Sequence, residues 1–335
     1  MNEKLIVSGR NILDLFPHEK IWGVSIPIYL FIGGLAAGLL IFATLFYILN
    51  KENQYPFTVK VATIIPFFII SLGLLLLIED LRHKLYFWQL MLHFKIESPM
   101  SWGSWVLVAI TIISIFWPLS FIEDITNYFE TKNKPRLAKI SSKIQKFSTK
   151  YNFIKKILDF FKSKRKEISY FLFALSVVLG IYTGILLSSF NARPIWNNSI
   201  ISILFLVSGA STAAALLMWL TNNKEERKLY SKIDIGLISF ELILIGLFLL
   251  SMQWGTEIQQ RAIKMFTDGV FTAPFWGIFV LGGLVMPLTL EIMEARKIHI
   301  PVGVPAFLVL FGGLIFRIIM VFICRNCMMN INLHL

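Results

Sequence analysis

Eight long apolar runs constrain this chain more than any other feature of its sequence. Each run is long enough to cross roughly 30 Å of hydrocarbon as an α-helix. Because unpaired backbone groups are costly in lipid, each run is predicted to be helical. Only 16% of the 335 residues are charged, against about a quarter in soluble proteins. The sequence predicts an all-α integral membrane protein, a single transmembrane domain of eight transmembrane helices in bundles, with spans at 24–49, 59–78, 103–121, 168–190, 199–221, 233–252, 273–293 and 302–323.

The distribution of lysine and arginine predicts how these helices are oriented. Of the 32 basic residues, 13 lie in the connection between the third and fourth runs, residues 122–167. Since basic connections are preferentially cytoplasmic, this connection is predicted to be cytoplasmic and both termini to lie outside. The net charge of +12 is interpreted as a membrane-topology signal, and no nucleic-acid partner is expected.

The same connection carries Phe, Ile and Leu at helical spacing. Two interpretations stay open at this point. The segment is an amphipathic surface helix that binds anionic lipid or a partner. Alternatively, it is a solvated connector whose charges only set the topology, because exposed charges usually contribute little.

With this orientation, polar and aromatic residues gather at the outer membrane face. A belt of interfacial aromatic residues explains isolated tryptophans, but ionisable groups at the membrane edge need a partner, a wet cavity or a function. Such a set suits a quinone, whose ring stacks on Trp or Tyr and whose oxygens accept hydrogen bonds and exchange protons. Structural pairing of the charges is the alternative. The candidate residues are Tyr29, Asp80, His83, Ser101, Trp102, Trp105 and Arg193.

Three further ionisable residues lie deeper, within the apolar runs: Glu241, Glu291 and Arg317. Ionisable groups inside a membrane are functional candidates by default. One interpretation is a proton path that links the quinone site to the cytoplasm. The other is pairing between helices that only holds the fold together.

Haem and metal can be considered from the histidines and cysteines. A b-type haem in a helix bundle needs axial ligands that project from facing helices. No histidine lies inside an apolar run, so no haem is expected. Two cysteines, Cys324 and Cys327, are too few for a four-cysteine iron–sulfur cluster. The sequence therefore predicts no metal ligands in this chain.

Four stretches, in this order, carry a likeness to a known family. They are IYLFIGGLAAG (28–38), IEDLRHKLYFWQLMLHFKIESPMSWGSWVL (78–107), TGILLSSFNARPIWNN with LFLVSGASTAAALL (183–217), and GGLIFR (312–317). In them the chain resembles the NrfD-like membrane-anchor family, which includes the polysulfide reductase membrane subunit and related hydrogenase anchors. The resemblance covers nearly the whole chain apart from the basic connection. The family's acid-leucine-glycine-arginine-proline block reads Asp80-Leu81-Arg82-His83-Lys84 here, so Asp80 matches the acid while the arginine and proline register differs.

The resemblance implies a haem-free subunit in a prokaryotic cytoplasmic (inner) membrane. Such a subunit exchanges electrons between the quinone or quinol pool and an extracytoplasmic ferredoxin-like iron–sulfur subunit, and proton coupling is an open addition. That partner contacts a catalytic subunit of the molybdopterin or nickel–iron hydrogenase type, so the iron–sulfur clusters and terminal catalysis lie outside this chain. The chain is then the membrane subunit of a quinone-linked oxidoreductase.

This interpretation gives the candidate residues distinct roles. Tyr29 and Trp102 contact the quinone ring, Ser101 or Tyr29 hydrogen-bonds one oxygen, and Asp80, aided by His83, exchanges the proton. Trp105 and Arg193 complete the binding set. For Asp80, an ion pair at the end of its helix is the alternative.

Two other function classes stay open. The chain is a purely structural anchor for its partner subunits, or it is a secondary transporter. A transporter usually shows internal repeats and broken helices at midplane, whereas here the polar residues concentrate at one face.

Overall fold

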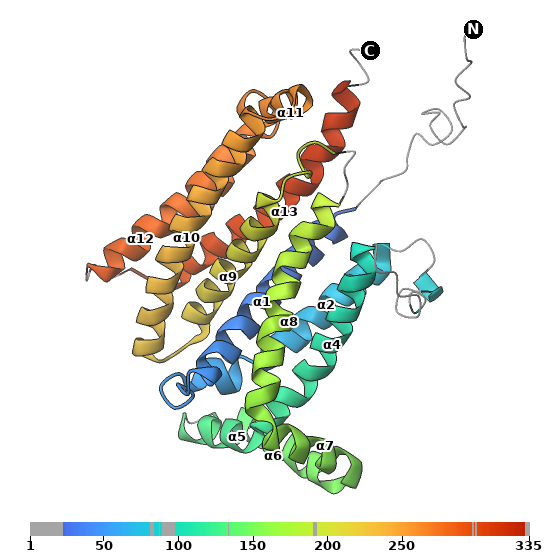
Figure 1. Ribbon diagram of the computed structural model, residues 1–335. Helices are drawn as coiled ribbons and strands as arrows, with labels where there is room; N and C mark the ends of the chain where they lie inside the picture. Colours follow the sequence, from blue (N-terminus) through green and yellow to red (C-terminus); the bar gives the residue numbers. More distant parts are fainter. Residues whose placement is uncertain are drawn as a thin grey trace.

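The computed structural model describes residues 23–80, 84–86, 88, 98–132, 134–189, 193–296, 298 and 300–331, with side chains except at Asp80, Leu85 and 324–331. Within these ranges the protein is helical and has no strand. Eight segments are long and apolar enough to cross a membrane. The predicted all-α fold with eight transmembrane helices is therefore confirmed (Figure 1).

The eight spans follow the apolar runs along the chain. Two of them contain π-helical stretches, η2 before α2 and η4 before α12. In sequence order the elements of the spans are α1 (Ser25–Ile48), η2 (Phe57–Val61), α2 (Ile64–Asp80), α4 (Pro99–Ser120), α8 (Arg165–Ser188), α9 (Ile200–Leu220), α10 (Lys224–Gln253), η4 (Ala273–Val285), α12 (Met286–Ala295) and α13 (Gly303–Ile331).

Two boundaries differ clearly from the sequence prediction, since α13 continues to Ile331 beyond the predicted end at 323 and α10 begins early. Helix α10 begins at Lys224, before the predicted start at residue 233. The cause is a polar N-cap, because the Asn223 side chain accepts a hydrogen bond from the Glu225 backbone N–H at 3.0 Å. Glu225 and Glu226 in the first turn also suit the positive end of the helix dipole. The polar first turns therefore make the helix begin earlier than hydropathy alone predicts.

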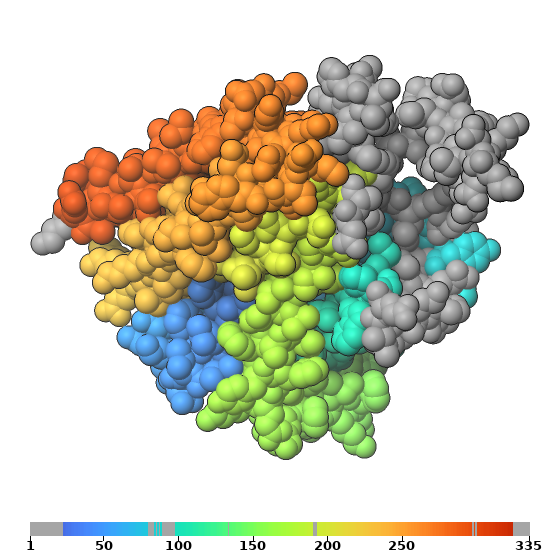
Figure 2. Space-filling view, turned by 45° about the horizontal axis from the view of Figure 1, so that its top comes forward, coloured from blue at the N-terminus to red at the C-terminus, as the bar shows by residue number. Residues whose placement is uncertain are grey.

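The spans pack as two four-helix rings. In the first ring, α1, α2, α4 and α8 contact one another in a closed circuit. In the second ring, α9, α10, α12 with η4, and α13 do the same. The rings are joined chiefly through α1, which packs on both α9 and α13, and through α8, which packs on α9. Figure 2 shows α8 (yellow-green) at the surface between the blue end of α1 and the teal α4.

Small residues allow the two rings to approach closely. A Cβ added at Gly209 of α9 would lie 2.7 Å from the Gly34 carbonyl oxygen of α1, too close for an ordinary contact. Within the second ring, Gly283 of η4 and Gly312 of α13 meet backbone to backbone in the same way. Close backbone approach at small residues is a recognised basis of helix association in membranes. The GGLAAG segment of α1 therefore serves packing between the rings.

The two ends of the bundle carry different elements. We call the basic end the one where α1 finishes, α10 begins, and the short helices α5 (Ile122–Thr131), α6 (Pro135–Lys150) and α7 (Asn152–Ser163) pack (Figure 1). We call the aromatic end the opposite one, where α1 begins, α2 ends, α4 begins and α11 (Glu257–Thr267) lies. The short helix η3 (Lys84–Tyr86) follows α2 there. The basic connection predicted from sequence is thus a helical layer on one end of the bundle.

Candidate functional site

The predicted quinone-binding residues lie at the aromatic end, mostly on the first ring. Tyr29 lies in the first turns of α1, α2 ends at Asp80, and α4 begins just before Ser101. The side chain of Asp80 and the whole of His83 are outside the described residues. The helices therefore deliver these backbone positions to a common end of one ring.

Two tyrosines meet inside the first ring at this end. Tyr29 of α1 is 4% exposed, and its ring packs against Gly73 of α2. Tyr182 of α8 is 7% exposed, and its ring occupies the space above Gly103 of α4, where any Cβ would overlap it. Both side chains are therefore enclosed within the first ring, near its aromatic end. Two buried tyrosines from different helices thus lie in the interior of the same ring.

Tyr182 is a candidate that the sequence analysis missed. It lies between two small residues in the segment GIYTG of the fourth span. The absence of a side chain at Gly103 is what makes room for its ring. Because Gly103 lies in the SPMSWGSW block, that block forms the surface on which the Tyr182 side chain packs.

Ser101, Trp102 and Trp105 divide between two environments on α4. Ser101 is buried at 7% exposure, and its carbonyl oxygen accepts a hydrogen bond from the Ser104 hydroxyl at 2.8 Å. Trp102 and Trp105 are 50% and 48% exposed. The indole rings therefore do not share the enclosed environment of Tyr29, and they lie on the outer flank of the first ring.

Arg193 belongs to a packed connection between α8 and α9. Its guanidinium carbon lies 4.6 Å from the centre of the Trp196 ring, a cation–π contact. Trp196 is itself buried, and its indole N–H donates a hydrogen bond to the Met320 carbonyl of α13 at 2.6 Å. Arg193 therefore helps to hold this connection against the second ring of helices. It lies at the aromatic end, but outside the first ring of helices that contains Tyr29 and Tyr182.

The deeper charges lie in the second ring, and the structure brings them together. Arg317 of α13 is 1% exposed and donates a hydrogen bond to the Phe205 carbonyl at 2.9 Å. Its guanidinium carbon lies 3.8 Å from the centre of the Phe205 ring. Glu241 of α10 is also 1% exposed, lies near the Ser208 hydroxyl and is attracted to Arg317. No direct ion pair joins Arg317 and Glu241 among the described residues, so these two opposite charges attract each other at longer range inside the protein.

Two further buried carboxyl groups, Asp234 and Glu291, lie between Glu241 and the basic end. Asp234 of α10 is fully buried and accepts a hydrogen bond from the Ser211 hydroxyl at 2.6 Å. Glu291 of α12 is equally buried and lies beside Asp234. Neither Glu291 oxygen has a hydrogen-bond partner among the described residues. Two ionised carboxylates this close in a low-dielectric interior would repel each other.

Asp234 and its serine partner were not singled out from the sequence. A signal was present, because Asp234 and Glu241 are seven residues apart on α10, nearly two helical turns and so on one face. Ser208 and Ser211 on α9 are three residues apart and face the same way. Their pairing with the acids of α10 depends on how the two helices dock. Glu241, Glu291 and Arg317 were predicted, and the structure links the first two through Asp234.

Not every buried acid in this protein belongs to this series of groups. Glu226, at the start of α10, accepts a hydrogen bond from the Phe57 backbone N–H at 3.2 Å and another from the Thr221 hydroxyl at 2.7 Å. Both carboxylate oxygens are therefore used to hold η2 and α10 together. Glu226 is interpreted as a structural residue.

Comparison with known proteins decides the family. The family model described as "Polysulphide reductase, NrfD" matches residues 16–327. The chain belongs to this family. The NrfD match includes all eight spans and therefore both rings. The resemblance seen in four stretches of sequence is confirmed.

Three relatives illustrate the range of the NrfD family. Protein NrfD of Escherichia coli strain K12 is 26% identical over 90% of this chain and 92% of that protein. A polysulfide reductase polypeptide of Wolinella succinogenes is 28% identical over 81% of this chain and 83% of that protein. A selenate reductase subunit from Mesobacillus selenatarsenatis is 24% identical over 81% and 66%. The chain is thus a membrane protein of a family that includes subunits of reductases.

The donor set at the aromatic end of this NrfD-family protein fits a quinone headgroup. A quinone presents two oxygens across a flat ring, and the first ring offers two buried hydroxyls, a buried serine and apolar aromatic walls. Among the residues that the structure describes, no cluster of His, Cys, Asp or Glu has the arrangement of a metal site. The hydroxyl groups of the described residues at this end can donate and accept hydrogen bonds.

Proposed function

We propose that this chain is the membrane subunit of a quinone-linked respiratory oxidoreductase. Electrons pass between the quinone or quinol pool and a ferredoxin-like iron–sulfur subunit that docks at the aromatic end. A catalytic subunit of the molybdopterin or nickel–iron hydrogenase type completes the complex. Support comes from membership of the NrfD family and from relatives named as parts of reductases.

The burial of Tyr29 and Tyr182 within one ring, at the end where α2 delivers Asp80, carries this proposal. Tyr29 and Tyr182 donate hydrogen bonds to the oxygens of the headgroup, and their rings hold it in place. Asp80 accepts or returns the proton as general base or acid. A bound quinone supplies two-electron, two-proton redox chemistry. The apolar walls of the first ring keep bulk water from these groups.

We also propose that the second ring moves protons. Arg317, Glu241, Asp234 and Glu291 form a series of buried ionisable groups from the middle of the bundle toward the basic end. Gly34 of α1 lies against Arg317, where an added Cβ would be 3.6 Å from the guanidinium. Tyr29 is five residues earlier on the same helix, roughly 8 Å along its axis. The start of the series therefore lies within a short distance of the tyrosine pair.

The orientation proposed for this function places the aromatic end outside. The membrane is the cytoplasmic (inner) membrane of a prokaryote, and both termini lie outside. The concentration of basic residues at the opposite end supports this orientation. The iron–sulfur partner then docks from outside, beside Trp102 and Trp105.

Variants in the first ring test the quinone site. Asp80→Asn and Tyr182→Phe should each lower quinol-dependent reduction in membranes, by about 100-fold for Asp80→Asn, because they remove a proton acceptor and a hydrogen-bond donor. Tyr170→Phe is the matched control, since Tyr170 is on the same helix and 52% exposed. Turnover and assembly of the complex are measured together.

Two outcomes would contradict the proposal. Near-normal turnover of Asp80→Asn and Tyr182→Phe with intact assembly would remove both residues from the reaction. A quinone analogue that leaves the fluorescence of the protein's tryptophans unchanged would favour a purely structural anchor. The wild-type protein should instead show quenching at the aromatic end.

A further inference from the structure

The helical layer α5–α7 has no part in the proposed electron or proton transfer, yet most of the basic residues of the third connection lie in it. Between residues 132 and 166 lie 13 of the 32 basic residues and one of the 20 acidic residues, which leaves 19 of each sign in the rest of the chain. The formal net charge of +12 therefore equals that of residues 132–166, which include α6, α7 and the start of α8. A charge concentrated in this way indicates an anionic binding partner.

Helix α6 has three distinct faces. One face packs on α5, where the Thr126 hydroxyl hydrogen-bonds to the Ser141 hydroxyl at 3.0 Å. A second face is apolar and exposed, with 41–58% exposure along its length. A third face is basic and lies roughly 100° further round the helix. The apolar face consists of Leu137, Ile140, Ile144, Phe147 and Tyr151, and the basic face of Lys139, Lys143, Lys146 and Lys150.

The apolar face continues the lipid-facing surface of the transmembrane helices. Ile144 lines a groove of about 180 Å³ together with Phe67 and Phe68 of α2 and Ile115 of α4. Phe68 is 64% exposed on a membrane-spanning helix, so lipid acyl chains cover it. Because Ile144 shares the groove with Phe68, the same acyl chains reach α6. This continuity favours lipid over a soluble protein as the occupant.

Helix α7 shows the same arrangement. Its Phe161 packs on Phe116 of α4, with ring centres 5.5 Å apart. Phe153 and Phe160 stay exposed at 76% and 58%. Phenylalanines exposed beside a transmembrane helix are typical of a helix that lies in the membrane interface.

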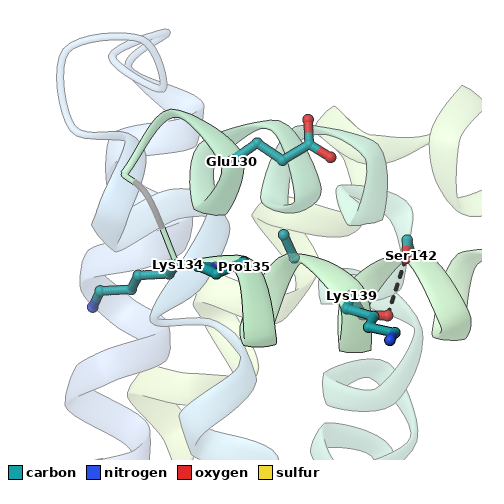
Figure 3. Close-up of a pocket in the computed structure, with 6 residues that line it drawn as sticks. Glu130, Lys134, Pro135, Lys139 and Ser142 are labelled. Atoms are coloured by element: carbon teal, nitrogen blue, oxygen red, sulfur yellow. Dashed lines mark hydrogen bonds between the residues drawn. The ribbon is translucent and has the colours of Figure 1, made fainter.

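The lysines of α6 are available to an anion. Lys162 and Lys164 near the end of the layer pair with Glu123 and Glu167. No ion pair within the described residues engages the four lysines of the basic face. Figure 3 shows Lys139 on α6 beside an open hollow of about 450 Å³ between α5 and α6, whose lining also includes Glu130 and Lys134.

We propose that α6 and α7 form a binding surface for anionic phospholipid. An acyl chain occupies the groove between α2, α4 and Ile144, and the phosphate lies against the basic face of α6. Phe147, one turn beyond Ile144, inserts beside it. The interaction combines buried apolar area with several lysine–phosphate contacts, each of which attracts an anionic membrane surface. It does not depend on the proposed quinone site.

Lipid retention by the full-length protein tests the basic face. The triple variant Lys143→Gln, Lys146→Gln, Lys150→Gln should lose its preference for phosphatidylglycerol over phosphatidylcholine by about tenfold or more, as measured by native mass spectrometry from mixed micelles. The control triple variant Lys224→Gln, Lys228→Gln, Lys232→Gln removes three exposed lysines of α10 near the same end and should retain the preference. Thermal midpoints show that both variants are folded. Equal retention in the two triple variants would overturn the proposal.

The apolar face has its own test. Phe147→Trp should add fluorescence that lipids brominated on their acyl chains quench in nanodiscs, relative to the parent protein, because position 147 reaches the acyl layer. Absence of added quenching would overturn the lipid surface and favour a soluble protein partner. Quenching that is stronger with brominated phosphatidylglycerol than with brominated phosphatidylcholine would support both halves of the site.

Discussion

Buried carboxyl groups in this protein are of two kinds. Glu226 has both oxygens bonded within the protein and so holds η2 against α10. Glu291 instead has no hydrogen-bond partner among the described residues and lies beside Asp234, where two ionised carboxylates would repel each other. Glu241 has one oxygen without a partner among the described residues. Groups that can gain or lose a proton without breaking the fold suit proton transfer better than groups that are fully bonded.

Neutral replacement of the buried acids tests proton transfer at the residue scale. Glu241→Gln and Asp234→Asn should abolish proton translocation in liposomes while quinol turnover persists, because an amide keeps the hydrogen bonds but cannot carry the proton. Glu225→Gln is the control, since Glu225 is exposed in the first turn of the same helix. Translocation is followed with a pH-sensitive dye. If either variant translocates protons as fast as the wild type, the residue replaced in that variant is not part of the proton path.

At the scale of elements, the contact between the rings depends on the small residues of α1 and α9. Gly38 meets Ala213 and the Gly209 carbonyl, and Gly34 meets Gly209. The atoms at this contact belong to the backbone, which cannot move away from an added methyl group as a flexible side chain can. A methyl group at this seam therefore separates the helices, and with them Arg317 from α1 and Tyr29.

A matched pair of glycine substitutions tests the seam. Gly209→Ala should lower the thermal midpoint in detergent by several degrees, because its methyl group would lie 2.7 Å from the Gly34 carbonyl oxygen. Gly236→Ala on α10 has no atom within 4 Å of the added methyl and should leave the midpoint unchanged or raise it slightly, since alanine favours the helix by about 1 kcal/mol. Equal midpoints for the two variants would show that the seam does not hold the rings together.

For the whole molecule, the arrangement separates two tasks. The first ring encloses the tyrosine pair at the aromatic end, and the second ring holds the buried ionisable series. The described part of α1 begins and that of α13 ends at the aromatic end (Figure 1). The helical layer α5–α7 covers the opposite, basic end. The proposed orientation thus places redox docking and lipid binding on opposite sides of one membrane.

Labelling of a single cysteine checks the orientation. With Cys324 and Cys327 replaced by serine, Lys146→Cys should react with a membrane-impermeant maleimide only after the cells are permeabilised, because α6 lies at the basic end. Trp254→Cys, 80% exposed near the aromatic end, should react in intact spheroplasts. The reverse pattern would invert the topology and exclude docking of an outer iron–sulfur partner on the aromatic end.

Much of this molecule could be predicted from its sequence. Lipid forces every crossing segment to bond its own backbone, so the lengths of the apolar runs determined the number and type of the spans. The residues around Asp80 and Ser101 could be placed at one end because they adjoin the ends of those spans. Glu241 and Arg317 were recognisable as candidates because charge is costly in lipid.

Only the tertiary structure decided which helices share a ring and which side chains meet. Tyr182 reaches the site because Gly103 on another helix leaves space for its ring, and Asp234 becomes significant because Ser211 and Glu291 approach it from two other helices. Likewise, the continuity of Ile144 with Phe68 depends on how α6 docks beneath α2. Apolar helices in lipid can pack in many ways at similar hydrophobic cost, since hydrophobic burial does not distinguish one partner helix from another. The choice rests on close contacts between distant small residues and on polar pairs, which no local pattern in the sequence encodes.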